Sequence, residues 1–512
     1  MTTTAKTTTA AILPRLNAGF LKKGNPDASL PEKVLQFGEG NFLRGFVDWM
    51  IHGMNRKGLF GGRVVVVQPI ATGLGDRLNA QDGIYTLLMR GVDGGKVVER
   101  QEVITSISRC INPYSEFQKY LDCAHNPELR FIVSNTTEAG IVYRAEDKAT
   151  EQPPASFPAK VTLLLLERYK AFGGDLSKGF VFLPCELINR NGDHLKKTVL
   201  ATAANWNLDA AFIEWIEKAN IFTSTLVDRI VTGYPRSEVE ALWHKAGYRD
   251  ELFNSCEAFH LWVIEGPASL AEELPLEKAG FHAVFTDNMK PYRDRKVRIL
   301  NGAHTSTVLA AYLAGKNYVG ECMDDPLISG FMKKAIHDEV IPTLSLPPQE
   351  LEAFASAVYE RFSNPFIKHA LLSISLNSIS KYKARVLPSL EAYVAAKGKV
   401  PARLAFGLAA LIAFYRGSEV KDGVLTGKRG ADEYTIKDGL PILEKFAQTW
   451  KEFDGSAEGA AKVANTILQQ TEWWGKDLRQ IHGLATVIAI YLYAITSSGM
   501  KTALSSLEHS LA

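Results

Sequence analysis

The sequence predicts an α/β fold in two parts, an N-terminal doubly wound parallel sheet followed by a mostly α-helical part. Three observations predict it. From residue 30 to about 285, apolar strand-like runs alternate with helical runs, which is typical of a parallel sheet with crossover helices. Two glycines, at positions 38 and 40, follow the first of these apolar runs. Beyond residue 290, helical stretches dominate and strand-like runs nearly vanish.

The first predicted strand, residues 34–37, ends at a glycine-rich turn. Gly38 would let the chain turn sharply, and Gly40 would let the backbone approach a pyrophosphate at a helix N-terminus. The pattern departs from the dinucleotide fingerprint, because Leu43 holds the place of the third glycine and Gly45 follows two residues later. A tight structural turn is an equal alternative to a cofactor site.

Two further strands would bring polar residues to the same edge of the sheet. The strand at 64–67 ends at Gln68, where dinucleotide-binding proteins often carry an acid that grips the ribose hydroxyls. Gln68 could still bond a ribose, so the choice between NAD and NADP stays open. The strand at 131–134 runs into Asn135, which suits a ligand crevice. An ordinary capping turn explains Asn135 equally well.

The remaining elements follow from periodicity. Residues 161–169 are predicted as a helix and 180–183 as a strand. Residues 416–430, rich in glycine and charge, are expected to form an exposed loop. The helices expected in the second part span residues 303–314, 328–341, 348–362, 365–379, 401–416, 440–452, 458–470 and 480–497.

Residues 296–304 carry three groups suited to chemistry on a carbonyl. An α-helix advances about 100° per residue, which places His304 roughly 80° and Asn301 roughly 140° from Lys296. The ammonium could move a proton while the amide and the imidazole hold the oxygen. Such spacing alone is more often a solvated face, so the trio needs support from the rest of the chain.

Together these segments resemble the polyol-specific long-chain dehydrogenases, a family that includes mannitol dehydrogenase and the hexuronate reductases. The family carries a Gly-x-Gly-x-Phe-x-Arg turn, present here from Gly38 to Arg44, and Lys-x4-Asn-x2-His, present from Lys296 to His304. Similar stretches follow one another in the same order along most of the chain, at residues 36–49, 134–141, 184–188, 224–236, 264–267, 290–304 and 361–369.

The resemblance implies a Rossmann-type NAD-binding domain over residues 30–287 and a helical substrate and catalytic domain over 288–512. It implies that Lys296 exchanges the proton while Asn301 and His304 hold the substrate oxygen. It also implies cofactor contacts from the turn and the neighbouring strand ends, at Val34, Leu35, Gln36, Phe37, Gly38, Glu39, Gly40, Asn41, Phe42, Leu43, Arg44, Gly45, Gln68 and Asn135.

Within this family the sequence is most similar to the branch that reduces hexuronates. Mannitol-type members carry Cys-Asp-Asn-Leu, whose asparagine joins the oxyanion hole. Residues 185–188 read Cys-Glu-Leu-Ile instead, and whether Asn189 or Asn191 replaces the asparagine stays open. A substrate carboxylate calls for fixed cations, and Lys368 and Lys381 are the candidates. A solvated surface charge is an equal alternative for each lysine.

The activity implied is NAD-dependent interconversion of D-tagaturonate and D-altronate by hydride transfer. Reduction of fructuronate or of a mannitol-type substrate is a close alternative. A uronate epimerase that keeps its nicotinamide bound is a further alternative, but it would need two opposed acid/base groups, and only Lys296 is evident. A non-catalytic NAD-binding regulator would have no use for the lysine, asparagine and histidine together.

Composition narrows the class of protein. The 58 basic and 56 acidic residues give a net charge of +2, which predicts no nucleic-acid partner. The five cysteines, at positions 110, 123, 185, 256 and 322, form no Cys-x-x-Cys pair and suit reduced thiols in a cytoplasm. The eleven histidines show no metal-ligand spacing, so no metal is expected.

Neither end of the chain indicates a membrane protein. The threonine-rich start has no apolar core of a signal peptide, and we expect residues 1–29 to form a flexible tail. The apolar stretch at 484–495 is too short to cross a bilayer and should be a core helix. The sequence leaves the oligomeric state open.

Overall fold

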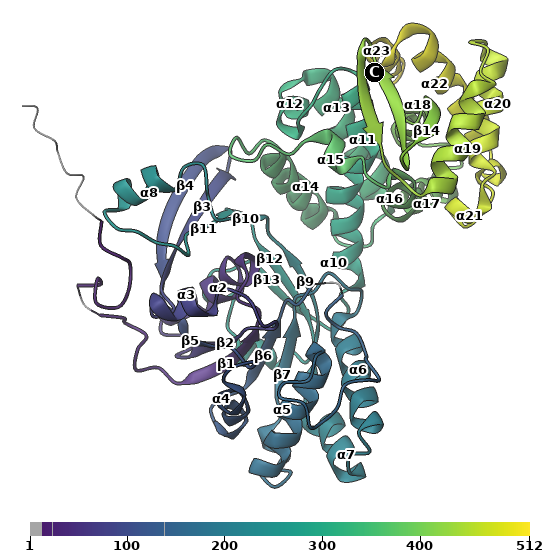
Figure 1. Cartoon of the computed structure of the whole chain (residues 1–512). Helices are drawn as coiled ribbons and strands as arrows, with labels where there is room; N and C mark the ends of the chain where they lie inside the picture. The colour runs from purple at the N-terminus through teal and green to yellow at the C-terminus, as the bar shows by residue number, and fades with distance from the viewer. Residues whose placement is uncertain (1–12, 23, 138) are drawn as a thin grey trace, which may run out of the picture. The chain divides into compact units, whose positions relative to one another are not determined.

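The structure is a computed structural model that describes residues 13–22, 24–137 and 139–512 (Figure 1). The chain divides into two compact units. The first comprises Met1–Asp93 and Val97–Met289, and the second comprises Gly94–Lys96 and Lys290–Ala512.

The first unit is built on a parallel six-stranded sheet in the order β5-β2-β1-β6-β7-β8. Counted along this sheet's own strands, the order is 3-2-1-4-5-6, which is that of the Rossmann fold and confirms the predicted fold class. The order reverses between β1 and β6, where such sheets open a crevice for ligands. The strands are β1 (Glu32–Phe37), β2 (Arg63–Val67), β5 (Ile107–Ile111), β6 (Phe131–Ser134), β7 (Val181–Pro184) and β8 (Ile221–Phe222).

Both faces of this sheet are buried, which explains why its strands are nearly continuous apolar runs. In β2, Val64 and Val66 join one hydrophobic cluster, while Val65 and Val67 join the other. The first cluster is covered by α2 (Val47–Arg56), and helices on the other face supply apolar residues to the second cluster. These helices are α4 (Phe117–Asp122), α5 (Phe157–Ala171), α6 (Asn191–Asn205) and α7 (Ala210–Ala219).

Two smaller sheets complete the first unit. One has the order β10-β11-β3-β4, and its long strands β3 (Tyr85–Asp93) and β4 (Lys96–Ile104) were not anticipated from the sequence. The other has the order β13-β12-β9. Their further strands and the short helices nearby are β9 (Ser224–Asp228), β10 (Val231–Gly233), β11 (Asn254–Glu257), β12 (Leu261–Glu265), β13 (Ala283–Thr286), α1 (Asn41–Arg44), α3 (Gly75–Ala80), α8 (Val239–Ala246) and α9 (Leu270–Glu273).

The expected flexible tail is packed where the structure describes it. The Leu16 side chain is fully buried in a cluster with Ile84 and Tyr248, and its backbone N–H donates to Arg249 O at 2.9 Å. The burial of Leu16 therefore anchors this segment. The polar composition of the first residues gave no sign of this contact. Residues 1–12 lie outside the described residues.

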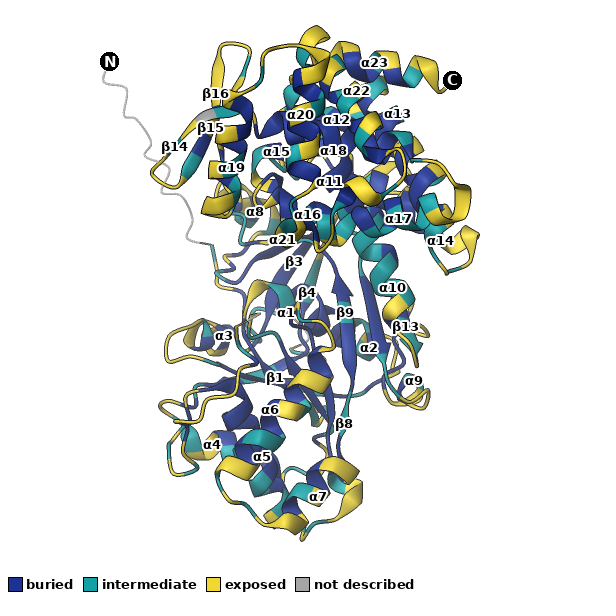
Figure 2. Cartoon of the chain, turned by 90° about the vertical axis from the view of Figure 1, so that its right-hand side faces the viewer, coloured by how far each residue is buried: buried dark blue, intermediate teal, exposed yellow. Residues whose placement is uncertain are grey.

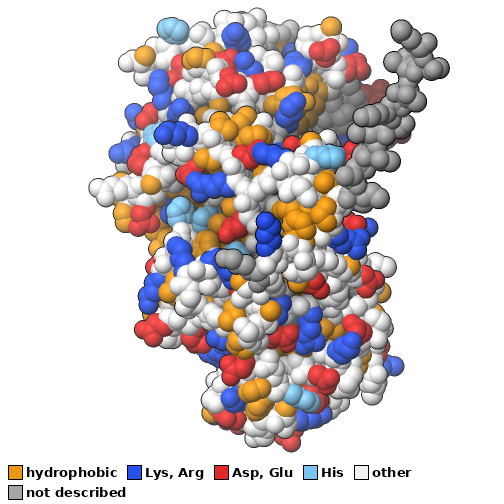
Figure 3. Space-filling view, turned by 90° about the vertical axis from the view of Figure 1, so that its left-hand side faces the viewer, with side chains coloured by type: hydrophobic (Ala, Val, Ile, Leu, Met, Phe, Trp, Pro, Cys, Tyr) orange, Lys and Arg blue, Asp and Glu red, His pale blue; other side chains and the backbone are white. Residues whose placement is uncertain are grey.

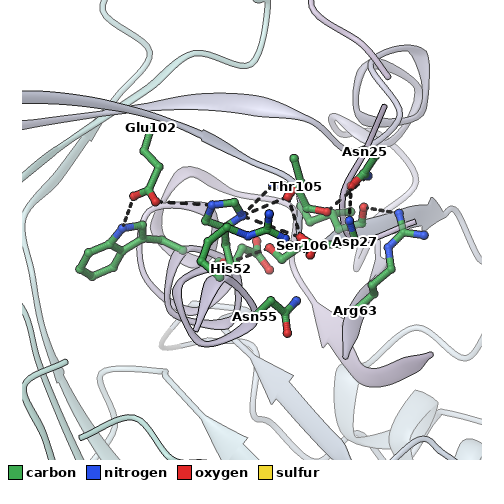
Figure 4. Close-up of polar contacts among 12 residues, drawn as sticks. Asn25, Asp27, His52, Asn55, Arg63, Glu102, Thr105 and Ser106 are labelled. Carbon is green, nitrogen blue, oxygen red and sulfur yellow. Dashed lines mark hydrogen bonds and ion pairs between the residues drawn. The ribbon is translucent and has the colours of Figure 1, made fainter. Parts of the chain in front are cut away.

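A buried polar cluster ties the same segment to the sheet (Figure 4). The Thr105 hydroxyl donates to Asp27 at 2.6 Å, and the Thr105 N–H donates to His52 Nδ1 at 3.3 Å. His52 Nε2 lies 3.4 Å from Glu102 Oε1. Trp49 also donates to Glu102, at 3.1 Å. These contacts give the cluster a structural role.

The second unit packs helices around α11 (Gly302–Leu313) and α18 (Ala402–Phe414), which are buried along nearly their whole lengths (Figure 2). Two π-helical stretches, η3 (Lys296–Asn301) and η4 (Ala335–Val340), interrupt the α-helices. The other helices are α10 (Lys290–Arg295), α12 (Val319–Asp324), α13 (Pro326–Lys334), α14 (Pro348–Phe362), α15 (Leu371–Ile374), α16 (Ser378–Arg385), α17 (Leu387–Lys397), α19 (Leu440–Lys451), α20 (Ala457–Leu468), α21 (Thr471–Trp474), α22 (Leu484–Ser498) and α23 (Met500–Ser510).

Two expectations for this unit are wrong. The helix predicted at 365–379 is broken, because residues 364–370 are irregular and Ala370 forms an isolated antiparallel bridge with Tyr318. The loop predicted at 416–430 is instead part of an antiparallel sheet of β14 (Gly417–Lys421), β15 (Val424–Arg429) and β16 (Asp432–Ile436). Leu425 and Ile436 pair across it and are buried against the helices.

The surface findings agree with the composition. Basic and acidic side chains are interspersed on the face drawn in Figure 3, without a large patch of one sign. Among the described residues, the structure contains no helix with the length and apolar character needed to cross a membrane.

Candidate active site

The turn after β1 leaves room for a ligand beside its backbone. Gly38 has a φ of 122°, which favours glycine, and a Cβ there would lie 3.3 Å from Asn135 O on the neighbouring strand end. At Gly40 a Cβ would meet no atom of the described residues within 4 Å. Helix α1 begins at the next residue. A bound dinucleotide fits this arrangement, since its pyrophosphate needs a close approach to the backbone.

Arg44 and Gly45 support this turn from inside the protein. Arg44 is buried and donates to Glu39 O at 3.2 Å, to Asn41 Oδ1 at 2.8 Å and to Leu252 O at 2.5 Å. A Cβ on Gly45 would lie 3.1 Å from atoms of Val231 and Asn254. Gly45 therefore permits the close packing that the third glycine of the dinucleotide fingerprint usually permits, two residues later in the chain. The Arg44 side chain closes the turn from within, so its predicted contact with the cofactor is not supported.

The trio in the second unit lies on an unusual helix. Residues Lys296–Asn301 form the π-helix η3, in which the backbone bonds connect residues five apart. Lys296 and Asn301, five apart, are thus closer to one face than the α-helical geometry assumed from the sequence would place them. His304 follows three residues later on α11, where it neighbours Asn301. Such π-helical turns occur frequently at functional sites.

The His304 side chain contains a buried nitrogen whose hydrogen-bonding capacity is unsatisfied in the described residues. Its Nε2 is buried and has no hydrogen-bond partner among the described residues. Its ring stacks on Phe362 at 4.2 Å between centroids and meets His369 edge-on at 5.4 Å. Burial, followed by the positive charges of His369 and Arg385, lowers the pKa of His304 to about 3. A neutral imidazole with one unsatisfied nitrogen is suited to hold a substrate oxygen.

Cations surround this histidine. Arg385 donates to Thr305 Oγ1 at 3.5 Å, next to His304, and the charges of Arg361 and Lys381 also act on the histidine. Lys381 donates to Ile374 O at 2.9 Å, and burial, followed by the charge of Arg385, lowers its pKa.

Lys381 was expected to bind the substrate carboxylate, and in the structure its charge acts on His304. Arg361 and His369, which also act on His304, were not expected there. Lys368 is exposed, so the structure gives it no comparable place. Arg361 and His369 lie within the family stretch 361–369, which was the available signal.

Comparison with known proteins decides the family. Residues 32–278 match the mannitol dehydrogenase Rossmann domain, and residues 288–496 match the mannitol dehydrogenase C-terminal domain. The chain belongs to the mannitol dehydrogenase family. An altronate oxidoreductase of Escherichia coli is 49% identical over 479 residues, covering 93% of this chain and 97% of that protein. The altronate oxidoreductase of another Escherichia coli strain is 48% identical with the same coverage.

Solved structures share the fold of this mannitol dehydrogenase family member. The mannitol 2-dehydrogenase of Pseudomonas fluorescens, in a ternary complex with NAD and D-mannitol, has a TM-score of 0.67 at 23% identity. That comparison covers 97% of this chain and 99% of the other. A D-sorbitol dehydrogenase in substrate-free form has a TM-score of 0.75 at 22% identity, covering 96% and 98%.

Several side chains expected at the cofactor are used for structure. Val34, Leu35 and Phe37 are buried in the hydrophobic clusters of the sheet, as is Leu43. Gln36 is buried and donates to Gly38 O and to Asp48 Oδ2, each at 3.1 Å. Their predicted cofactor contacts are not supported at the level of side chains.

Gln68 also has a structural task. Its Nε2 donates to Ile70 O at 2.8 Å, and its Oε1 accepts from Gly75 N at 3.2 Å. Both ends of the carboxamide therefore fix the loop after β2. The suggestion that Gln68 bonds the ribose is not supported, because nearly all of the side chain is buried and engaged.

The Cys-Glu-Leu-Ile departure has a physical explanation at the end of β6. Glu186 is buried and accepts from Ser134 Oγ at 3.0 Å and from Thr136 N at 2.9 Å, so it orders the backbone around Asn135. Asn135 itself donates to Cys185 O at 2.9 Å. Burial raises the pKa of Glu186. Glu186 thus orders the strand end whose Asn135 carbonyl lies close to Gly38.

Asn191 does not replace the missing oxyanion donor. Its Nδ2 donates to Pro184 O at 2.8 Å and to Glu186 O and Thr225 O at 3.1 Å each, while its Oδ1 accepts from Thr225 N at 2.8 Å. These bonds use the whole amide to join β7 to β9. Leu187, at the position of the family asparagine, has no donor.

Proposed function

We propose that this protein is an NAD-dependent oxidoreductase that interconverts D-altronate and D-tagaturonate. The observation that carries the proposal is the Lys296, Asn301 and His304 trio, with the unsatisfied Nε2 of His304 among cations. The altronate oxidoreductases that match almost the whole chain support the choice of substrate. The Rossmann strand order and the open space beside Gly40 support the choice of a dinucleotide.

In this mechanism the chain's own residues handle the proton and the oxygen. During oxidation of altronate, Lys296 Nζ takes the proton from the reacting hydroxyl, and during reduction it returns that proton. The Asn301 amide and the neutral His304 ring donate hydrogen bonds to the same oxygen, whose negative charge grows as the hydroxyl is deprotonated. NAD, when bound, supplies the hydride acceptor. The π-helical geometry of η3 brings the lysine and the amide toward one face.

A negatively charged substrate suits the charges around the trio. Lys381 and Arg385 are partly buried, and their charges reach His304. A carboxylate held there would gain charge-assisted hydrogen bonds, which are roughly twice as strong as neutral ones. This favours a hexuronate over an uncharged ketose such as fructose. We also infer a cytoplasmic enzyme, because all five cysteines are buried without a disulfide.

Oxidation of NADH by purified protein tests the proposal with tagaturonate, fructuronate and fructose as substrates. Tagaturonate should be reduced at least about tenfold more efficiently than fructose, since about 1.4 kcal/mol of differential binding gives that ratio. A preference for fructuronate would move the assignment to another hexuronate reductase. Net interconversion of hexuronates without consumption of NADH would indicate an epimerase.

A further inference from the structure

We propose that Glu39, in the turn after β1, supplies the carboxylate that binds the adenosine ribose of the dinucleotide and rejects a 2′-phosphate. The inference rests on the proposed NAD-dependent function and adds the residue that chooses between NAD and NADP. In Rossmann folds this role usually belongs to an acid at the end of the second strand. Here β2 ends at Val67 and is followed by Gln68, whose carboxamide is committed to its own loop.

The structure brings Glu39 to the end of β2 from the neighbouring turn. Glu39 Oε1 lies 3.4 Å from Leu74 N, in the loop that follows β2. A Cβ built on Gly73 would lie 2.1 Å from Glu39 Oε1 and 2.8 Å from Gln68 Oε1. The carboxylate and the carboxamide therefore meet at Gly73. Gly38 N also donates to Val67 O at 3.1 Å, which fastens the turn to the same strand end.

The chemistry of this carboxylate matches the role. A carboxylate accepts hydrogen bonds at two oxygens, so it can bind the adjacent 2′- and 3′-hydroxyls of a ribose together. Its contact with Leu74 N is long, and its other recorded hydrogen bond comes from its own backbone N–H, so acceptor sites remain for a ligand. Glu39 is 8% exposed, and in such a poorly hydrated place its charge is weakly screened. A 2′-phosphate brought there would be strongly repelled.

The neighbouring cations do not offset this repulsion. The charge of Arg44 acts on Glu39, but the Arg44 guanidinium is buried and bonded to Asn41 and Leu252 on the protein side. Arg77 on α3 is exposed and directly follows the acid Asp76. An arginine placed for a 2′-phosphate would instead stand beside the ribose hydroxyls.

A purely structural role for Glu39 makes a different prediction. If Glu39 only held the loop at Leu74, its replacement would weaken NADH and NADPH binding equally. If it binds the ribose, the replacement must change the ratio of the two affinities. The ratio is therefore the decisive quantity, and it can be measured by binding alone.

The test measures dissociation constants of NADH and NADPH by fluorescence titration of the full chain and of its Glu39→Gln variant. The wild type should bind NADH at least about tenfold more tightly than NADPH, and Glu39→Gln should narrow that gap by about tenfold or more. The matched control is Glu214→Gln, because Glu214 is an exposed acid on α7 paired with Lys218. This control should leave both constants unchanged.

A second measurement needs no variant and protects the test against misfolding of Glu39→Gln. Competition by 5′-AMP, 2′-deoxy-5′-AMP and 2′,5′-ADP against NADH probes the adenosine half on the wild type. Loss of the 2′-hydroxyl should weaken binding about tenfold, and the 2′-phosphate should weaken it further. Equal affinities for the three fragments, or an unchanged NADH to NADPH ratio in a folded Glu39→Gln variant, would overturn the inference alone. Failure of the wild type to bind NADH would remove the proposed function as well.

Discussion

The imidazole of His304 stacks on the phenyl ring of Phe362, with 4.2 Å between ring centroids and 13° between ring planes. The stack fixes the plane of the imidazole and covers one of its faces with an apolar surface. Together with nearby positive charges, burial keeps His304 neutral, with a pKa of about 3. The geometry therefore holds a hydrogen-bonding group in position without making it a competing acid in the physiological pH range.

This neutral histidine predicts a pH dependence of stability. Its ordinary pKa of 6.5 falls to about 3 on folding, so between these values the unfolded chain binds one more proton than the folded chain. The stability of the second unit should be fully present above pH 6.5 and fall as the pH drops toward 3, by about 1.4 kcal/mol per pH unit. Urea unfolding of the wild type and of His304→Gln measures it. An equal slope in both proteins would contradict the assignment.

Lys296 is predicted to be the proton carrier. Lys296→Ala should lower turnover by several orders of magnitude, because the reacting oxygen would lose its acid/base partner, while NADH binding should be nearly unchanged. Asn301→Ala should lower turnover by on the order of 100- to 1000-fold through loss of a donor to the oxygen. Lys290→Ala is the control, since Lys290 is exposed on α10 and paired with Asp294. Near-native turnover of Lys296→Ala would remove the lysine from the mechanism.

The sequence predicted the Rossmann sheet well because local patterns determine it. The valines of β2 and the glycines of the turn after β1 are short-range signals that survive in one sequence. The β14–β15 hairpin was missed, although Asp422 and Gly423 have positive φ values and form the Asp-Gly pair typical of hairpin turns. Its many glycines and charged residues predicted a loop. The buried residues of β15 and β16 are too few to produce a clear strand pattern in the sequence.

The geometry of the candidate site could not be predicted from local sequence patterns. Residue types and spacing predicted Lys296, Asn301 and His304 as candidate site residues. They could not reveal the π-helix, because the α-helical period was assumed. Sequence patterns also could not show that the Gln68 carboxamide hydrogen-bonds within the loop after β2, or that the Glu39 carboxylate lies beside that same loop. Such exchanges of role depend on contacts between residues far apart in sequence, which a local pattern does not encode.

An ion-pair cluster around the buried Arg403 should stabilise the helical unit. Arg403 is buried at the start of α18 and donates to Glu508 at 2.7 Å and to Asp338 at 3.2 Å. Arg403→Met would remove the charge-assisted hydrogen bonds to Glu508, which keeps Lys334 at 3.0 Å, and to the exposed Asp338, and should cost about 1.5–3 kcal/mol of unfolding free energy. Urea denaturation measures this cost. Lys462→Met, at an exposed pair with Glu458 on α20, is the control and should cost less than about 1 kcal/mol. Similar costs for the two variants would contradict the role of the cluster.

The cations near His304 predict how the enzyme separates a uronate from a neutral sugar. Lys381→Met and Arg385→Met should raise the KM for tagaturonate about tenfold or more, while activity toward fructose should change much less, because only the uronate carries a carboxylate. The loss should appear chiefly in KM, since the carboxylate lies far along the sugar from the reacting carbon.

Lys368→Met supplies the matched control for this prediction, because Lys368 is a lysine of the same region that lies exposed. Its KM for tagaturonate should stay within about twofold of the wild type, as expected for a solvated surface charge. If Lys368→Met raised KM as much as Lys381→Met, the carboxylate would be bound at the surface lysine instead. If fructose matched tagaturonate in the wild type, the cations would have no role in selectivity and the activity would be that of a general polyol dehydrogenase.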